Sequence, residues 1–144
     1  MKRVLKIFAL VPILAGCAGG EIVQNVVPYT GTNSKPYEIC VITNAKVKPT
    51  VLDAYKDSLI ARGLTVRILP AGSAVGSCPV TSTYLLRWAW DIGEYMVYAD
   101  FKVYSGNQLA GEAVYDATNA PGSFDKFVHV NQKIDELTGK LFPN

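Results

Sequence analysis

The stretch from residue 37 to residue 69 restricts the fold more than any other part of this chain. Two short apolar runs, "YEICVI" at 37–42 and "LTVRIL" at 64–69, flank one amphipathic segment. Both runs are rich in β-branched residues and short enough to be strands. A strand, a helix and a second strand within about thirty residues predict a right-handed parallel βαβ unit.

The segment between the two runs, "KPTVLDAYKDSLIARG", has the start and stop signals of a helix. Pro49 stands near its beginning, Thr50 and Asp53 have the spacing of a capping box, and Gly63 follows the last apolar position. The residues predicted to form its buried face are Leu52, Tyr55 and Leu59.

Three further strands are predicted at 81–90, 95–104 and 108–116, where short turns separate alternating runs. They form an antiparallel meander. The chain then closes with one helix, capped by Ser123, whose apolar stripe is Phe127, Val130, Ile134, Leu137 and Leu141. The sequence therefore predicts a two-layer α+β sandwich of about five strands, with two helices on one face.

The register of the first meander turn decides whether Trp88 and Trp90 face the core. The predicted opposite pairs are Trp90 with Tyr95, Trp88 with Val97 and Leu86 with Ala99. This register gathers the bulky apolar residues on one face, whereas a slip of one residue would add charged residues to it. Both tryptophans are therefore predicted to lie in the core.

The opposite face of the meander is the candidate partner surface. Its predicted members are Arg87, Tyr98, Asp100, Lys102, Tyr104 and Glu112, with Leu85, Met96 and Val114 beside them. Arg87 is diagonal to Asp100, within reach of a salt bridge. Two interpretations stay open: such a face is commonly just solvated, but tyrosine, arginine and methionine are residues that interface cores favour.

The amino terminus has the features of a secretory signal. Lys2, Arg3 and Lys6 precede an uncharged apolar run from Ile7 to Gly16, which is shorter than the roughly 20 residues that a membrane-spanning helix needs. The following "LAGC" at 14–17 resembles the lipobox of bacterial lipoproteins. That resemblance implies diacylglycerol transfer to the Cys17 sulfur, cleavage before Cys17 and acylation of the new amino terminus; an ordinary secretory signal is the alternative.

Three regions follow: a signal peptide at 1–16, a lipidated cysteine and tether at 17–36, and one α+β domain at 37–144. Glycines and prolines break any regular element in the tether, although "EIVQNVV" at 21–27 is apolar enough to pack on the domain or a partner instead. The chain has 14 lysines and arginines, and the three before Cys17 are removed, leaving 11 against 12 acidic residues. Without a basic run, nucleic acid is not an expected partner.

Cys40 and Cys78 remain after Cys17 is assigned to the anchor. In an oxidising compartment two leftover cysteines are most simply a disulfide, with two buried free thiols as the alternative. No metal site is expected, since the chain has one histidine and no closely spaced Cys or His pair.

The motifs "LPAG", "SCPVTSTY", "RWAWD" and "YMVYADFKVY", together with the lipobox and the terminal helix, resemble a family of short Gram-negative outer-membrane lipoproteins. The resemblance covers almost the whole mature chain and implies no activity. Sorting rules for such lipoproteins depend on the residues after the cysteine. Ala18 and Gly19 imply the outer membrane, most simply its periplasmic leaflet.

The sequence is compatible with three functions: a non-enzymatic envelope module that binds a protein partner, a binder of lipid or glycan on the open sheet face, and an enzyme. The enzyme is the weakest, because His129 lies off the apolar stripe and no catalytic triad is present. Asp100 and Glu112 are the one carboxylate pair that could divide acid and base roles. No cofactor is expected.

Overall fold

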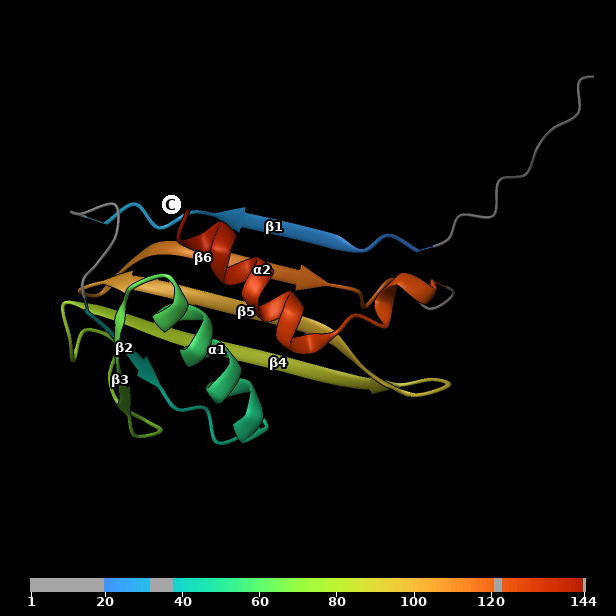
Figure 1. Ribbon diagram of the computed structural model, residues 1–144, viewed down its shortest axis with the longest axis horizontal. Coiled ribbons are helices and arrows are strands. Elements are labelled where there is room, and N and C mark those ends of the chain that lie inside the picture. The colour runs from blue at the N-terminus through green and yellow to red at the C-terminus, as the bar shows by residue number, and fades with distance from the viewer. Residues whose placement is uncertain (1–19, 32–37, 121–122, 144) are drawn as a thin grey trace, which may run out of the picture.

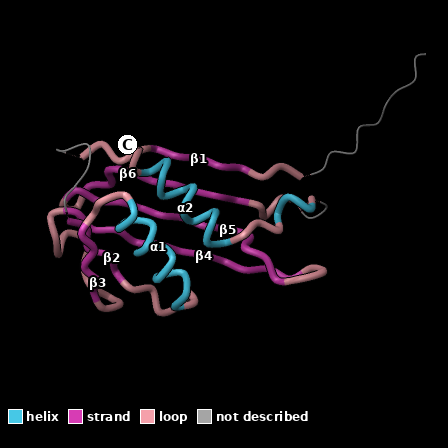
Figure 2. The backbone as a smooth tube through the Cα atoms, viewed as in Figure 1, coloured by secondary structure: helices cyan, strands magenta, loops and turns pink. Residues whose placement is uncertain are grey.

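A computed structural model describes residues 20–31, 38–120 and 123–143. Within these ranges the chain forms one six-stranded mixed sheet with strand order β1-β6-β5-β4-β2-β3 (Figures 1 and 2). The strands are β1 Val23–Val27, β2 Glu38–Ile42, β3 Thr65–Leu69, β4 Val80–Trp90, β5 Glu94–Ser105 and β6 Gln108–Asp116, and the helices are α1 Pro49–Ala61, the 3₁₀ helix η1 Phe124–Lys126 and α2 Val130–Leu141. The predicted signal peptide and Cys17 lie outside the described residues.

The predicted βαβ unit is confirmed, since β2 and β3 pair in parallel and α1 connects them. The core receives the predicted inner face of α1, namely Leu52, Tyr55 and Leu59. The predicted capping box is wrong, because Lys48 occupies the N-cap position and no side chain caps the helix. Gly63 follows α1 with a φ of 81°, a left-handed conformation that a residue with a side chain rarely adopts.

Strands β4, β5 and β6 form the predicted antiparallel meander. Strand β4 also pairs in parallel with β2, so the meander and the βαβ unit share one sheet. Helices α1 and α2 lie side by side on the same face of that sheet (Figure 1). The two-layer α+β fold is therefore confirmed, with one strand more than predicted.

The additional strand is β1, which lies within the predicted tether. It pairs antiparallel with β6, so the alternative in which this segment packs on the domain is the one that the structure shows. Just after β1, Tyr29 is buried, and its backbone N–H donates to the carbonyl of Leu141 at 2.8 Å. A Cβ at Gly111 would lie 2.9 Å from the Tyr29 Cα, so this glycine lets β6 approach the segment closely.

The predicted register of β4 and β5 is right at Leu86, which lies opposite Ala99, and wrong at the tryptophans. A β-bulge before Trp88 places that residue opposite Met96. Met96, predicted on the open side, is fully buried, and Trp88 is half-buried against the core. Trp90, predicted in the core, is 76% exposed, because the β4–β5 hairpin continues past the end of the helical layer (Figure 1).

The C-terminal segment, predicted as one helix, is two. Ser123 is a cap as predicted, since its Oγ accepts a hydrogen bond from the Asp125 N–H at 3.2 Å, but it caps η1. The extended residue His129 precedes α2. Phe127, predicted on the helical stripe, instead packs against the ring of Tyr95, with 5.3 Å between centroids. The buried apolar residues of α2 are Ile134, Leu137 and Leu141.

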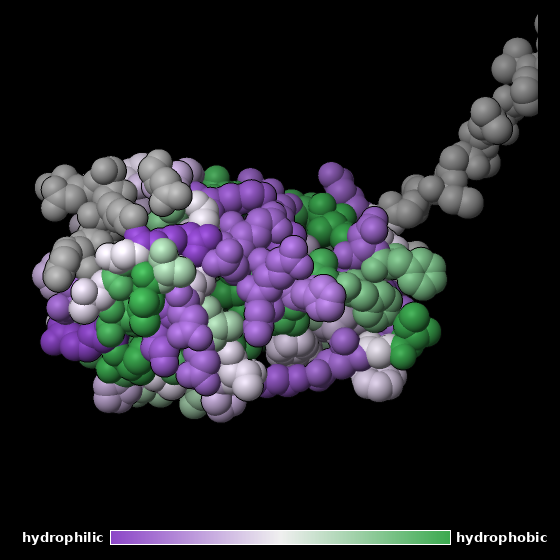
Figure 3. All heavy atoms as spheres, viewed as in Figure 1, coloured by the Kyte–Doolittle hydropathy of each residue, from purple (hydrophilic) through white to green (hydrophobic). Residues whose placement is uncertain are grey.

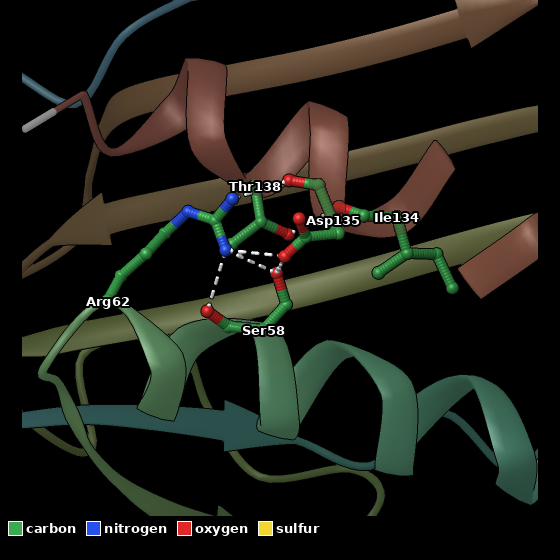
Figure 4. A network of polar contacts seen from close by, with 5 residues as sticks. All are labelled: Ser58, Arg62, Ile134, Asp135 and Thr138. Carbon is green, nitrogen blue, oxygen red and sulfur yellow. Dashed lines mark hydrogen bonds and ion pairs between the residues drawn. The ribbon is translucent and has the colours of Figure 1, made fainter. Parts of the chain in front are cut away.

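A polar network joins the two helices (Figure 4). Arg62 reaches from the end of α1, and its Nη1 donates to Asp135 Oδ1 at 2.6 Å while its Nη2 donates to the Asp135 carbonyl at 2.8 Å. Ser58 Oγ donates to the same carboxylate at 2.7 Å. The hydrogen bonds from Arg62 and Ser58 lower the pKa of Asp135. In α2 the Thr138 hydroxyl donates to the Ile134 carbonyl at 2.7 Å. The polar groups of this network therefore bond to one another and hold α1 against α2.

A second network attaches β1 to α2. Glu136 accepts hydrogen bonds from Lys133 Nζ at 2.6 Å, Lys140 Nζ at 2.8 Å and Gln24 Nε2 at 3.0 Å. Lys133 and Lys140 lie one turn before and after Glu136 on α2, whereas Gln24 belongs to β1. The hydrogen bonds from Lys133, Lys140 and Gln24 together lower the pKa of Glu136 to about 2.

We expect Glu136→Gln to reduce the acid sensitivity of the fold. The folded-state pKa lies below the unfolded value of 4.5, so the carboxylate stabilises the fold above that pH and loses this effect as the pH falls. Because the Glu136 side chain is 39% exposed, solvent screening limits the effect to about 1 kcal/mol.

Urea unfolding at about pH 6 and about pH 2.5 measures this difference. The variant should be less stable than the wild type at the higher pH, and most of this difference should disappear at the lower pH, which is close to the folded-state pKa. Asp57→Asn, which changes an exposed carboxylate on α1, is the matched control and should unfold like the wild type at both. An equal loss of stability by Glu136→Gln at both pH values would contradict the expectation.

Candidate partner-binding surface

Since both helices cover one face of the sheet, the other face carries no helix within residues 20–31, 38–120 and 123–143 (Figure 1). Strand alternation decides which side chains lie there, because Phe101 and Ala113 are a buried pair and their strand neighbours point the other way. We call the following set the open face: Leu85, Arg87, Tyr98, Asp100, Lys102, Tyr104, Leu109, Glu112, Val114, Val23 and Val27. It includes all six predicted partner-surface residues.

The centre of the open face is a cluster of three charges. Lys102 Nζ lies 2.7 Å from Asp100 Oδ2 and 3.3 Å from Glu112 Oε1. The Asp100 side chain is only 9% exposed, and that of Lys102 is 33% exposed. The hydrogen bond to Asp100 raises the pKa of Lys102 despite the opposing effect of desolvation. Lys102 therefore stays charged beside the two carboxyl groups.

Arg87 stacks on Tyr98 at the border of this cluster. Its guanidinium carbon lies 4.3 Å from the ring centroid, in the geometry of a cation–π contact. Arg87 is opposite Tyr98 and diagonal to Asp100, as predicted, but the predicted salt bridge does not form, because the guanidinium lies over the Tyr98 ring and Asp100 pairs with Lys102. The Tyr98 hydroxyl points toward Asp100 Oδ2 at a long 3.5 Å, and burial together with this carboxylate raises the pKa of Tyr98.

Apolar side chains lie on both sides of the charges. Leu85 is 38% exposed on β4, and Leu109 is 53% exposed on β6, where a second bulge turns it outward. Val23 and Val27 of β1 are 45% and 59% exposed. Sequence reasoning missed the two valines, because it assigned their segment to the tether. Tyr104 is half-buried. The open face thus combines fixed charges, aromatic rings and exposed aliphatic groups.

The predicted disulfide between Cys40 and Cys78 is present, with its Cα atoms 6.2 Å apart. Cys40 lies on β2 and is fully buried, and Cys78 belongs to the loop before β4. Arg67 Nη2 lies 2.9 Å from Cys78 Sγ and 3.3 Å from Glu38 Oε1. The disulfide and Arg67 therefore hold the loop before β4 against the sheet. This loop borders the open face on the side of β2 and β3.

His129 is exposed. It borders a hollow of about 250 Å³ whose charged lining residues, Lys133 and Glu136, pair with each other at 2.6 Å. In the described part of the chain, no group of three or more His, Cys, Asp or Glu residues could hold a metal ion. None of the described helices has the length and apolar character to cross a membrane.

Comparison with known proteins identifies the fold. No protein-family model and no curated protein matches this sequence. The PelC dodecamer from Paraburkholderia phytofirmans matches with a TM-score of 0.55 at 12% identity, over 84% of this chain and 94% of that chain. A single-residue variant of that PelC matches with a TM-score of 0.52 at 13% identity over the same shares.

A minor lipoprotein from Acinetobacter baumannii matches with a TM-score of 0.41 at 13% identity, over 73% of this chain and 90% of that chain. A similarity of that size supports no argument about this protein. The two PelC structures, at their low identity, show the fold alone. This chain therefore shares its fold with PelC.

Proposed function

We propose that this protein is a lipid-anchored module of the bacterial envelope that binds a protein partner and catalyses no reaction. The "LAGC" motif supports an acyl anchor on Cys17. Ala18 and Gly19 support the outer membrane, because no aspartate follows the cysteine, and its periplasmic leaflet is the simplest location. The partner is proposed to bind the open face.

The observation that carries the partner proposal is the preset arrangement of charges on that face. Asp100 and Lys102 are held 2.7 Å apart with little exposure, although no helix of the described chain covers them. Arg87 is fixed by its stack on Tyr98. Groups that are already ordered lose little conformational entropy on binding, and tyrosine and arginine are enriched among residues that dominate binding energy.

A lipid or glycan ligand is the second candidate. The rings of Tyr98 and Tyr104 stand two residues to either side of the Asp100–Lys102 pair along β5. Aromatic rings can pack on the apolar side of a sugar, and a carboxylate beside an ammonium group can bind its hydroxyls. This candidate predicts the same binding face and a different class of ligand.

Site-specific photo-crosslinking in intact cells tests the proposal. A benzophenone amino acid in place of Leu85 lies on the open face, and the same amino acid in place of Ile60 on α1 is the matched control at 51% exposure. We expect a discrete crosslinked protein from position 85 and none from position 60. Arg87→Ala in the first background should reduce the crosslink about tenfold, for a lost contact of about 1.4 kcal/mol, while the protein accumulates normally.

The crosslinked species identifies the class of partner. A ladder of multiples of this chain would identify a second copy, which deserves the test because the matching PelC structures are dodecamers. A crosslink to lipid or glycan alone would favour the second candidate. Equal crosslinking from positions 85 and 60 would contradict the assignment of the open face.

A further inference from the structure

Among the described residues, the three most exposed large apolar side chains lie at one end of the domain. Phe124 is 78% exposed, and Trp90 and Ile92 are each 76% exposed. Trp90 ends β4, Ile92 is in the following turn, and Phe124 begins η1. Apolar side chains gather at this end in the space-filling view (Figure 3). We call these three residues the apolar tip.

The apolar tip has a defined structure, because side-chain contacts fix the turn between β4 and β5 to η1. Lys126 Nζ pairs with Asp91 Oδ2 at 2.6 Å, and the Lys126 side chain is 2% exposed. The ring of Tyr95 packs on Phe127. The backbone N–H of Asp91 donates to the carbonyl of Gly93 at 3.0 Å and closes the turn. These contacts order the backbone next to the apolar tip, whose three side chains are exposed to solvent.

The chain enters the described domain at the same end. Val23, the first residue of β1, lies opposite Asp116, and the next residue, Ala117, donates to the carbonyl of Val97 beside the start of β5. Figure 1 shows β1 beginning at the end where the β4–β5 hairpin turns and η1 lies. Cys17 precedes Gly20 by three residues, a reach of at most about 11 Å.

The charges of the β4–β5 hairpin also suit a neutral lipid interface. The acidic residues of the hairpin are neutralised, since Asp91 pairs with Lys126 and Glu94 pairs with Lys48 at 2.5 Å. The two lysines are engaged in the same way and are not displayed as a basic patch. Tryptophan is enriched at the level of lipid headgroups, and an acyl anchor becomes more stable with a second membrane contact.

We propose that the apolar tip, formed by Trp90, Ile92 and Phe124, inserts into the headgroup region of the leaflet that holds the acyl chains of Cys17. This inference rests on the proposed lipid anchor. With the acyl chains and the apolar tip both at this end of the domain, the strands would extend away from the membrane surface. The open face would then remain accessible at the side of the molecule, where a partner can reach it.

Fluorescence quenching by brominated lipids tests the proposal on the full lipidated protein, because the chain has 2 tryptophans. Trp88→Phe leaves Trp90 as the reporter, and Trp90→Phe leaves Trp88. In phosphatidylethanolamine vesicles we expect bromine to quench most of the Trp90 emission and to leave Trp88 unchanged. If Trp88→Phe fails to fold, the difference between wild type and Trp90→Phe isolates the same signal.

The double variant Ile92→Ser/Phe124→Ser should reduce the quenching of Trp90 and leave the melting temperature unchanged, since both side chains are exposed. Val27→Ser/Leu109→Ser, at 59% and 53% exposure on the open face, is the matched control and should leave the quenching unchanged. Added salt should not alter it either, because the contact is apolar.

Flotation of the vesicles separates the two proposals. Protein that floats with an unquenched Trp90 would overturn the apolar tip and leave the anchor intact; a protein partner for the tip is then the explanation to follow. Protein that does not float would overturn both the anchor and the inserted tip. Quenching of Trp90 and Trp88 to the same degree would show that the orientation is wrong.

Discussion

Cys17→Ser should convert the whole population of this protein from acylated and membrane-bound to unacylated precursor. The resemblance to the lipobox implies that the Cys17 sulfur receives the diacylglycerol and that cleavage follows this transfer. A serine hydroxyl does not replace the thiol in that step. Each buried methylene of an acyl chain contributes about 0.8 kcal/mol, so two or three chains hold the protein almost permanently and their loss removes the attachment.

Three measurements check this expectation: incorporation of a labelled fatty acid, the mass of the mature protein, and flotation of membranes on a density gradient. Ala18→Ser is the matched control, because it makes the adjacent position polar and keeps the sulfur. That control should be labelled, cleaved and membrane-bound. Normal cleavage of Cys17→Ser would show instead that an ordinary secretory signal operates.

The connection between Cys17 and the domain is shorter than the sequence predicted. The sequence predicted a tether through residue 36, but β1 begins at Val23. Only residues 18–22 separate Cys17 from the first strand, so the proposed anchor would hold the domain by the end at which β1 begins. A short connection of this kind restricts the orientation of the open face relative to the membrane, which a long coil would leave free.

Strand and helix periodicity predicted most of the fold. The βαβ unit, the meander and the inner face of α1 follow from apolar spacing, because each element buries one side against a shared core. The shared location of the six candidate residues also follows, since all six lie on the open face. The alternation of side chains along a strand can be identified from the sequence alone, without knowledge of the tertiary contacts of each residue.

The bulge in the β4–β5 hairpin was not predictable in this way. Arg87 pairs with Tyr98 and Trp88 with Met96, so Val97 is the extra residue. Its carbonyl accepts the hydrogen bond from Ala117, a contact that depends on the third strand of the meander. A bulge reverses the alternation beyond it, which explains why Met96 is buried despite its prediction on the open side.

Tertiary contacts also explain two further errors, the missed strand β1 and the single C-terminal helix. In β1 the inward position Gln24 is polar because its amide donates to Glu136, so the segment lacks the alternation that marks a strand. Near the C-terminus, Lys126 pairs with Asp91 and Phe127 packs on Tyr95, which separates η1 from α2. Each partner is distant in sequence, and local propensity does not contain that information.

Removing the disulfide should cause the second large effect. Cys40 and Cys78 are separated by 38 positions, and the loop that they close contains α1 and β3. On the chain-entropy model, the double variant Cys40→Ala/Cys78→Ala should lose about 4 kcal/mol of unfolding free energy. Strand β3 should be the first element to unfold locally, because this edge strand pairs only with β2 among the described strands.

The measurement is urea unfolding of the double variant in a Cys17→Ser background, which removes the third thiol. The disulfide-intact Cys17→Ser protein should stay unlabelled by a thiol reagent, because Cys40 and Cys78 are 0% and 5% exposed and their sulfurs are bonded to each other. Ser77→Ala, next to Cys78 in the same loop, is the matched control and should keep nearly full stability. A double variant as stable as its parent, or free labelling before reduction, would contradict the assignment; a large loss would show that this covalent link keeps the βαβ unit in the sheet.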